Sequence, residues 1–324
     1  MLGVDVGKDA LYGTWRDPKT QRIRWQGEEP NTEAGIRRLL KRAPASDVVV
    51  EPTGRYGEPL IRAAQASGRT VLQAVPRKAR AFLWAEQPRA KTDRVDSAGL
   101  ALYGLTGRLR PYLLPSPAVD LVNQLLAARR GLSQSLMSLR QQRDSLPLAA
   151  EALTPAIEGL ERELAALDDR LKEAAKAEEL AAAVATLQAV PGVGEVVAPA
   201  LAACLVAKRF THPDQFVAHV GLDIRVHQSG RRKGQLGLSK HGDAELRRLL
   251  YVAAMAAARS TKDPTFADRY QRERAKGLPR IAALNAVARK LAKVAWSLIT
   301  HGSTYDPERV DTQPPPPAPA PTEP

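Results

Sequence analysis

The chain has 324 residues, of which 44% are hydrophobic, and this is enough to fill the cores of two compact domains. Its 48 Lys and Arg residues against 35 Asp and Glu residues leave a formal net charge of +13, which favours nucleic acid over a neutral small molecule as partner. The single cysteine, Cys204, excludes a disulfide framework or a thiolate metal site within one chain.

Cys204 lies in an apolar run that is too short to span a bilayer, so we expect it to be a small buried residue. The N-terminus has no signal-peptide pattern. These features predict a protein of the cytoplasm with no membrane partner.

The first hundred residues alternate between strand and helix patterns, which indicates an α/β layer. Strands are predicted at 2–6, 22–26, 48–50 and 71–75, and helices at 32–42, 59–67 and 91–105.

Four acidic residues in this region stand at unusual places. Asp5 lies at the centre of an apolar strand, and Glu51 ends the next apolar strand. Asp93 and Asp96 are three residues apart at the start of a helix, which puts both on one face. Each acid alone has an ordinary explanation, as an ion-pair partner, a loop cap or a helix N-terminal acid.

Together, these four acids predict a site for one or two Mg²⁺ ions, because Mg²⁺ takes oxygen ligands and paired ions activate phosphodiesters. Without a metal, carboxylates crowded in this way would repel one another and take up protons. The prediction requires their side chains to meet in space.

The middle of the chain, from 117 to 180, is rich in leucine at helical spacing. Leu125, Leu132, Leu139 and Leu146 recur every seven residues, which predicts long helices with breaks at Pro147 and Pro155. Such a stripe forms either the inner face of an intramolecular hairpin or a seam between two chains.

A second globular part covers about 187–301 and is predicted to be helical at both ends. Its centre, 221–242, is rich in Gly, Ser, Lys and Arg, which predicts a loop or short hairpin that approaches an anion. After Asp306 the chain is rich in proline and is predicted to be a disordered tail.

Several short motifs resemble the IS110 family of transposases, and they follow one another in the family's order over nearly the whole chain except the tail. They are Gly-Val-Asp-Val-Gly-Lys at 3–8, Val-Glu-Pro-Thr-Gly-Arg-Tyr at 50–56, Lys-Thr-Asp-Arg-Val-Asp-Ser at 91–97, Pro-Gly-Val-Gly at 191–194, Gly-Leu at 221–222, Ser-Gly at 229–230, Leu-Ser-Lys-His-Gly-Asp at 238–243 and Leu-Arg-Arg-Leu-Leu at 246–250.

This resemblance implies an RNase H-like domain of the RuvC type at 1–112, with Asp5, Glu51, Asp93 and Asp96 as its catalytic metal ligands. It further implies a helical coiled-coil segment at 113–183 and a mainly α transposase domain at 184–304, before the tail at 305–324. The departures from the family pattern are Ser97, where alanine is usual, and Asp223, where an apolar residue is usual.

The family's chemistry implies a nucleophilic serine, for which Ser229 is the first choice and Ser239 the alternative. Arg231, Arg232, Lys233 and Lys240 are the expected nucleic-acid contacts. The resemblance also implies that a noncoding guide RNA selects the DNA and that the chain forms a dimer or tetramer.

Three other functions share some of these features. A RuvC-like nuclease would use the same acids to activate water, and a silent derivative would bind nucleic acid without cutting it. A phosphate-binding kinase of the actin-like type also opens with a strand aspartate, but the chain has no second Asp-x-Gly loop downstream.

Overall fold

A computed structural model describes residues 1–51, 54–86, 92–225, 228–229, 232–233 and 237–310. The chain divides into two compact units, Met1–Leu114 and Pro115–Pro324. No helix among the described residues is both long enough and apolar enough to cross a membrane.

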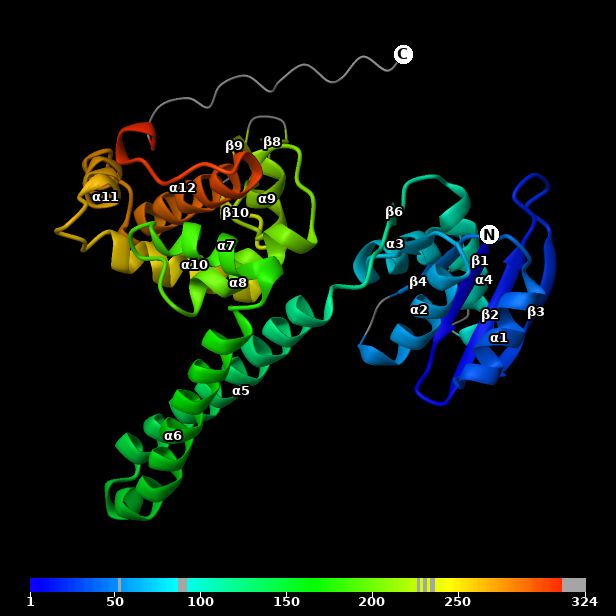
Figure 1. The fold of residues 1–324 in the computed structure, drawn as a ribbon, viewed down its shortest axis with the longest axis horizontal. Coiled ribbons are helices and arrows are strands. Elements are labelled where there is room, and N and C mark those ends of the chain that lie inside the picture. Colours follow the sequence, from blue (N-terminus) through cyan, green and yellow to red (C-terminus); the bar gives the residue numbers. More distant parts are fainter. Residues whose placement is uncertain (52–53, 87–91, 226–227, 230–231, 234–236, 311–324) are drawn as a thin grey trace. The chain divides into compact units, whose positions relative to one another are not determined.

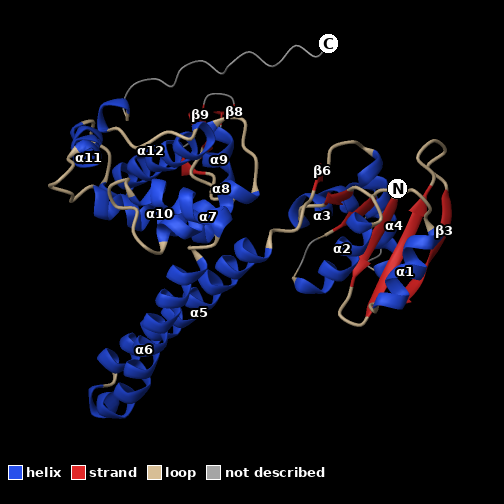
Figure 2. Ribbon diagram, viewed as in Figure 1, coloured by secondary structure: helices blue, strands red, loops and turns tan. Residues whose placement is uncertain are grey.

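The first unit is a mixed α/β layer, as the alternating patterns predicted (Figures 1 and 2). Its six-stranded sheet has the order β3-β2-β1-β4-β5-β6, in which β1, β4 and β5 are parallel and the other pairs are antiparallel. The strands are β1 (Leu2–Val6), β2 (Ala10–Arg16), β3 (Ile23–Pro30), β4 (Val48–Val50), β5 (Val71–Gln73) and β6 (Arg110–Pro111). The helices are α1 (Glu33–Arg42), η1 (Arg55–Gly57), α2 (Glu58–Ala66), α3 (Pro76–Glu86) and α4 (Asp93–Leu105).

β2, α3 and the two-residue strand β6 were not predicted from the sequence. β2 pairs on both sides, with β1 and with β3. A side chain at Gly13, in its middle, would meet the side chains of Leu39 and Trp25 within 3 Å. The glycine that makes room for these neighbours therefore weakens the strand pattern in the sequence.

The two faces of β1 pack against different helices. Leu2 and Val4 share a core with residues of α1 and α2. A side chain at Gly3 would instead collide with the backbone of α4 at Ser97 and Ala101, 2.3 Å away. Because successive strand residues alternate between faces, Asp5 belongs to the face that α4 covers.

The second unit begins with a pair of long helices, α5 (Pro117–Ser145) and α6 (Ala150–Ala174), joined by η2 (Pro147–Ala149). The two helices pack against each other, and Arg129 forms an ion pair with Asp168 across them. Of the leucine stripe, Leu125 is buried, Leu132 and Leu139 are half-buried, and Leu146 is exposed. The predicted break at Pro147 is confirmed.

The predicted break at Pro155 is wrong, because this proline lies inside α6. It is the sixth residue of the helix, so only the amide bond to Glu151 O is lost, and packing against α5 keeps the helix continuous.

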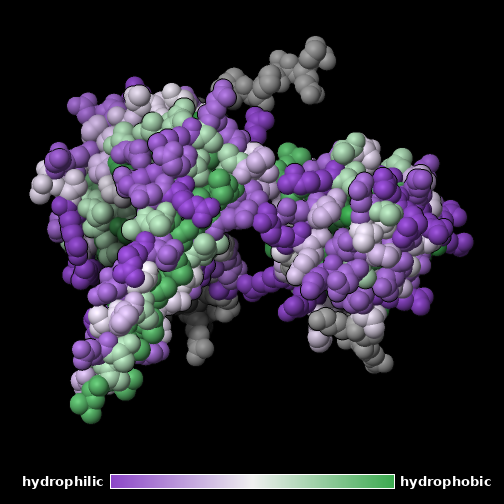
Figure 3. Space-filling model, turned by 60° about the horizontal axis from the view of Figure 1, so that its bottom comes forward, coloured by the Kyte–Doolittle hydropathy of each residue, from purple (hydrophilic) through white to green (hydrophobic). Residues whose placement is uncertain are grey.

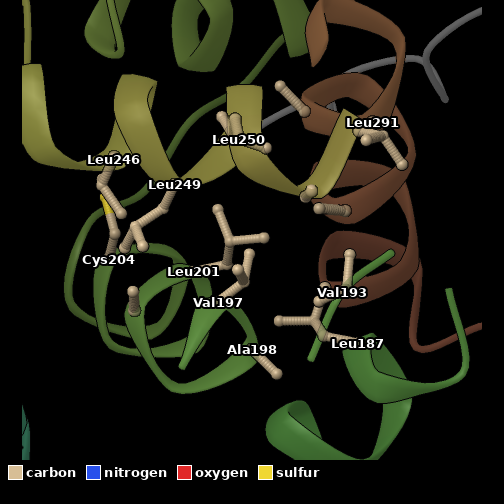
Figure 4. Packing of buried hydrophobic residues seen from close by; sticks show 14 of the residues in the cluster. Leu187, Val193, Val197, Ala198, Leu201, Cys204, Leu246, Leu249, Leu250 and Leu291 are labelled. Carbon is tan, nitrogen blue, oxygen red and sulfur yellow. The ribbon is translucent and has the colours of Figure 1, made fainter. Parts of the chain in front are cut away.

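The helical core of this unit is built from small and aliphatic residues (Figure 4). Leu201 and Leu250 are fully buried there, and Cys204 is 8% exposed, which confirms it as a core residue. The helices are α7 (Glu178–Gln188), α8 (Val197–Ala207), α9 (Pro213–His219), α10 (Ala244–Ala257), α11 (Thr265–Ala275) and α12 (Arg280–His301), followed by η3 (Pro307–Arg309).

Packing continues past residue 304, where the sequence placed the domain end. The hydroxyl of Tyr305 donates to Asp263 Oδ2 at 2.9 Å, and Val310 is 3% exposed. The remainder of the predicted tail, 311–324, lies outside the described residues.

Candidate active site

Asp5 and Glu51 lie at neighbouring strand ends of the first unit. The parallel register of β1 and β4 pairs Val4 with Val50. Asp5 and Glu51 are the next residues after this pair, one following each strand position. Both carboxylates are half-buried. The sheet itself therefore fixes two acids at its carboxyl edge.

Helix α4 brings Asp93 and Asp96 to the same edge. Its backbone touches β1 at Gly3, through Ser97 and Ala101. Asp5 is two strand residues beyond Gly3, about 6.6 Å further on. Asp93 is one turn of α4 before Ser97, about 5.4 Å along the helix. The close approach at Gly3 thus aligns the start of α4 with Asp5.

Side-chain hydrogen bonds fix the first turns of α4. Thr92 caps the helix by accepting from the Val95 amide at 3.3 Å. Arg94 Nε donates to Gln26 Oε1 at 2.7 Å, and Gln26 Nε2 donates to Arg94 O at 3.0 Å. The hydroxyls of Ser97 and Thr14 are 2.7 Å apart, and both residues are fully buried.

The hydrogen bond to Thr14 gives a physical reason for Ser97, one of the two departures from the family pattern. The hydroxyl connects α4 to β2 at a contact where alanine would leave no bond.

The electrostatics of Asp5 show that the four acids are gathered. Burial, followed by the charges of Asp93, Asp96 and Glu51 in that order, raises the pKa of Asp5 to about 6. The side chains predicted from the sequence therefore lie within electrostatic range of Asp5, on one edge of the unit.

The donor chemistry of this edge fits a divalent cation, because it consists of carboxylates whose mutual repulsion a cation would relieve. As placed, however, no three acids, histidines or cysteines among the described residues are close enough to form one ligand set. The structure thus gathers the donors and leaves their coordination geometry undefined.

A cationic helix at this edge was not predicted from the sequence. Helix α3 follows the carboxyl end of β5, which is parallel to β1 and β4. It exposes Arg77, Lys78 and Arg80, and its Trp84 is 65% exposed. Cations beside an exposed indole are typical of surfaces that bind nucleic-acid strands. The signal was Pro-Arg-Lys-Ala-Arg directly after a strand.

The other candidate region is residues 221–242 of the second unit, which we call the serine segment. It holds four short strands: β7 (Ile224–Arg225), β8 (Gln228–Ser229), β9 (Arg232–Lys233) and β10 (Gly237–Leu238). β8 pairs with β9, which sets Ser229 opposite Arg232. Arg231 and the side chains of Ser229, Arg232 and Lys233 lie outside the described part.

Close backbone contacts hold the two ends of the serine segment together. A side chain at Gly242 would meet His219 O at 2.2 Å and Gly221 N at 2.6 Å. The Asp243 amide donates to His219 O at 2.8 Å. Burial raises the energy of a charged ring, which lowers the pKa of His219 to about 4 and keeps it neutral.

Ser239 and Asp223 belong to this closure. Ser239 is 7% exposed, its hydroxyl donates to the Asp223 carboxylate, and it accepts from the His241 amide at 3.3 Å. The Ser239 amide donates to Asp223 O at 2.8 Å. Asp223, the second departure from the family pattern, is thus the partner of Ser239, whose hydroxyl already has two hydrogen bonds.

Lys240 comes next and is exposed, with a positive φ of 53°. Its amide donates to Gly221 O at 3.2 Å, so the ends of the segment impose this left-handed backbone.

Two family models match the chain, a transposase model of the IS110 DEDD type over residues 2–146 and the "Transposase IS116/IS110/IS902 family" model over 184–271. The chain belongs to the IS110 family of transposases. The two matched ranges include both regions of this transposase that carry the candidate residues.

Relatives with transposase or gene-inverting names are consistent with this family. The "Probable family 20 transposase" of Pseudomonas aeruginosa is 30% identical over 56% of each chain. The "Pilin gene-inverting protein" of Moraxella bovis is 24% identical over 94% of this chain and 97% of its own. The "Transposase for insertion sequence element IS1111A" of Coxiella burnetii is 35% identical over 43% of this chain and 38% of its own.

Proposed function

We propose that this transposase cuts and rejoins DNA strands, using Asp5, Glu51, Asp93 and Asp96 to hold Mg²⁺ and Ser229 as the nucleophile. The observation that carries the proposal is the set of three further acids that raise the pKa of Asp5. An RNase H-like fold of the RuvC type for the first unit agrees with acids at the carboxyl ends of β1 and β4.

When bound, Mg²⁺ would neutralise phosphate oxygens and lower the pKa of an attacking hydroxyl. The chain's own part is to hold the acids in place and to orient the phosphate. Gln26 and Thr14 hold the start of α4, so Asp93 and Asp96 keep their places when a polyanion arrives. Exposed cations on α3 supply attraction for the DNA backbone at the same edge.

In the proposed reaction, the Ser229 hydroxyl loses its proton and attacks phosphorus. One P–O bond to deoxyribose breaks, a phosphoserine ester forms, and the released sugar hydroxyl takes a proton. The ester keeps the bond energy, so a second hydroxyl can rejoin the strand without ATP. Arg231, Arg232 and Lys233 next to Ser229 would balance the phosphate charge.

Ser229 is preferred to Ser239 because the Ser239 hydroxyl is already engaged in holding the ends of the serine segment together. Ser239 is buried and bonded to Asp223. Ser229 lies on β8, which pairs with β9 in the middle of the segment, between β7 and β10 in the sequence.

We further propose a guide RNA and a dimer or tetramer, both taken from the family resemblance. Support for assembly comes from the free end of the α5–α6 hairpin, where Leu146 is 52% exposed and Leu148 fully exposed. Figure 3 shows hydrophobic residues along this hairpin and at its tip. Sedimentation of the Leu148→Asp variant as the same oligomer as wild type would count against assembly through this tip.

The deciding experiment is denaturing electrophoresis of the protein with Mg²⁺, DNA of its element ends, and the flanking RNA. We expect a covalent protein–DNA species that is absent from Ser229→Ala and Asp93→Ala, with a loss of about a thousandfold or more. The Ser239→Ala variant serves as the matched control and should still form the species, with lower thermal stability.

Cleavage without an adduct, at equal rates in wild type and Ser229→Ala, would instead identify a hydrolytic nuclease. Binding without cleavage would identify a silent derivative. An adduct that forms equally well without the RNA would remove the guide from the proposal.

A further inference from the structure

A large groove in the second unit is not explained by the serine chemistry alone. It has a volume of about 1680 Å³ and is bordered by α9, α11, α12, the β7–β10 strand pair and the segment after α12. We call it the α12 groove. Its walls come from segments that are more than 90 residues apart in the sequence, so no local sequence motif predicts it.

The charge of the α12 groove is strongly positive. Within the described residues, three acids line it, Asp214, Glu273 and Asp306. Twice as many cations do so: Lys240, Arg269, Arg289, Lys290, Lys293 and Arg309. An excess of cations in a concave site attracts polyanions, because the low-dielectric walls concentrate the field.

One face of α12 forms the floor of this groove. Ala282, Ala286, Arg289 and Lys293 follow one another at helical spacing on that face. The opposite face packs in the helical core through residues such as Leu291 (Figure 4). Small alanines next to long cations leave room for a ligand above the helix.

A hydrogen bond through Nε fixes the Arg289 side chain and leaves its Nη groups to bind an anion. Its Nε donates to Leu222 O at 3.0 Å, and within the described part of the chain its Nη groups donate to no acceptor. Burial and the nearby charge of Arg269 lower the pKa of Arg289, and Asp223, Asp214 and Glu273 offset this in part. A phosphate bound between Arg289 and Arg269 would relieve the repulsion between the two guanidinium groups.

The groove also offers apolar surface beside its cations. Ile281 is 65% exposed and Ile224 is 47% exposed, and both line the groove. A positively charged groove that follows the backbone is one half of a single-strand site. The exposed isoleucines supply apolar surface for the bases and sugars in place of the usual aromatic rings.

The α12 groove is continuous with the serine segment. Ile224 and Leu238, which form the β7–β10 pair, are part of its wall, as is Lys240 with its imposed backbone. β8, which carries Ser229, lies between β7 and β10 in the sequence and pairs with β9. Ser229 is five residues from Ile224 of the groove wall, so a DNA strand joined to it would be held close to the groove.

We propose that the α12 groove binds single-stranded DNA, namely the stretch that flanks the phosphate attacked by Ser229. This proposal rests on the proposed function. Lys240 and Arg289 bind its phosphates, while Ile224 and Ile281 contact its sugars and bases. Lys293 forms an ion pair with Asp214 at 2.6 Å and contributes to the positive field of the groove. The groove thereby keeps the cut strand near the serine until rejoining.

The test measures binding by fluorescence anisotropy with labelled oligo(dT) of about 20 nucleotides over a range of salt concentrations. The Lys240→Gln/Arg289→Gln variant should bind about tenfold more weakly. Its slope of log K against log salt should fall by about 1.4, since each phosphate contact on a single strand contributes about 0.7.

Arg259→Gln/Lys262→Gln is the matched control, because it removes two exposed cations of the same unit. It should leave the slope unchanged. Since Arg289 also bonds to Leu222 O, Ala282→Glu provides a second variant that adds a negative charge to the groove floor without removing that bond. It should weaken binding at least as much.

Equal losses in the groove and control variants would overturn the proposal. Losses confined to oligo(U) would overturn it as well, by assigning the groove to RNA. The Ser229→Ala variant should bind oligo(dT) like wild type. Binding is thus measured apart from strand transfer, and a failure of the serine chemistry would be seen separately.

Discussion

The two candidate regions are held in place by different means. The acidic edge of the first unit stands on long-range pairing, with β1 and β4 in register and α4 against Gly3. The serine segment has only two-residue strands, and its ends are closed by Gly221, Gly242 and the bond between Ser239 and Asp223. A rigid sheet thus fixes the acids, while a closed loop positions the serine.

From this difference we expect some substitutions to affect strand transfer and others to affect the stability of the fold. Changes under the acidic edge move the acids and disturb the fold together. Changes in the outer part of the serine segment alter chemistry with little effect on the fold, whereas changes at its base act on the fold.

The largest effect on the acidic edge is expected from Gly3→Ala. The new methyl group would meet the α4 backbone at 2.3 Å, which neither element relieves without moving α4 away from β1. We expect a loss of stability of about 1–3 kcal/mol or more, as is usual for overpacking. Urea denaturation measures this loss.

The same substitution should also weaken stabilisation by Mg²⁺, because Asp93 and Asp96 move with α4. Thermal melts with and without Mg²⁺ test this. Gly57→Ala, in the same unit, serves as a comparison, because its new methyl group would make only ordinary van der Waals contacts at 3.8 Å or more. An unchanged response to Mg²⁺ in Gly3→Ala would contradict the alignment of α4 with Asp5.

The second prediction concerns Asp5→Asn, which removes a charge from the cluster. In chelator at pH 7.5 we expect a higher melting temperature than wild type, since the charged Asp5 is destabilised by burial and by Asp93, Asp96 and Glu51. Strand transfer should nevertheless be lost. A stable but inactive variant would separate the fold from the chemistry at this edge.

The pH dependence of Asp5 has a definite sign. Its pKa is about 6 in the folded state and 3.8 in the reference state, so the folded protein binds the proton more tightly between these values. Stability therefore rises as pH falls from 6 to 4. His219 acts with the opposite sign, so the measured quantity is the difference between wild type and Asp5→Asn. A difference that stays constant over this range would argue against the cluster.

The smallest effect is expected from Ser97→Ala. This change removes the buried hydrogen bond to Thr14, which still accepts from Gln26 Nε2 at 2.8 Å. The expected cost is about 1 kcal/mol, measured by chemical denaturation. Thr14→Val should cost less in this background than in wild type, because the shared bond is already gone and only the bond from Gln26 Nε2 remains to be lost. Fully additive losses would show that the two hydroxyls act independently.

The strand and helix patterns located most elements of the first unit to within a few residues. They failed for β2, where Gly13 makes room for Leu39 and Trp25, and for α3. They also failed at Pro155, where packing of α6 on α5 overrides the local effect of proline. In each case a contact with a distant segment outweighed the local preference.

The four acids could be named from the sequence because each stands where an acid is costly or well placed, on a strand or at a helix start. Their convergence could not be derived from spacing, since it depends on the register of β1 with β4 and on α4 lying against Gly3. The roles of Ser97 and Asp223 were equally hidden, because their partners, Thr14 and Ser239, are 83 and 16 residues away.

The sequence alone determined the element types, the basic charge, the acid set and the family resemblance, because these follow from local patterns and residue chemistry. Only the tertiary structure decided that the acids share one edge, that Ser239 is enclosed, and that cations from distant segments form the α12 groove. The physical reason is that burial and electrostatic coupling depend on distance in space, which the order of residues along the chain does not specify.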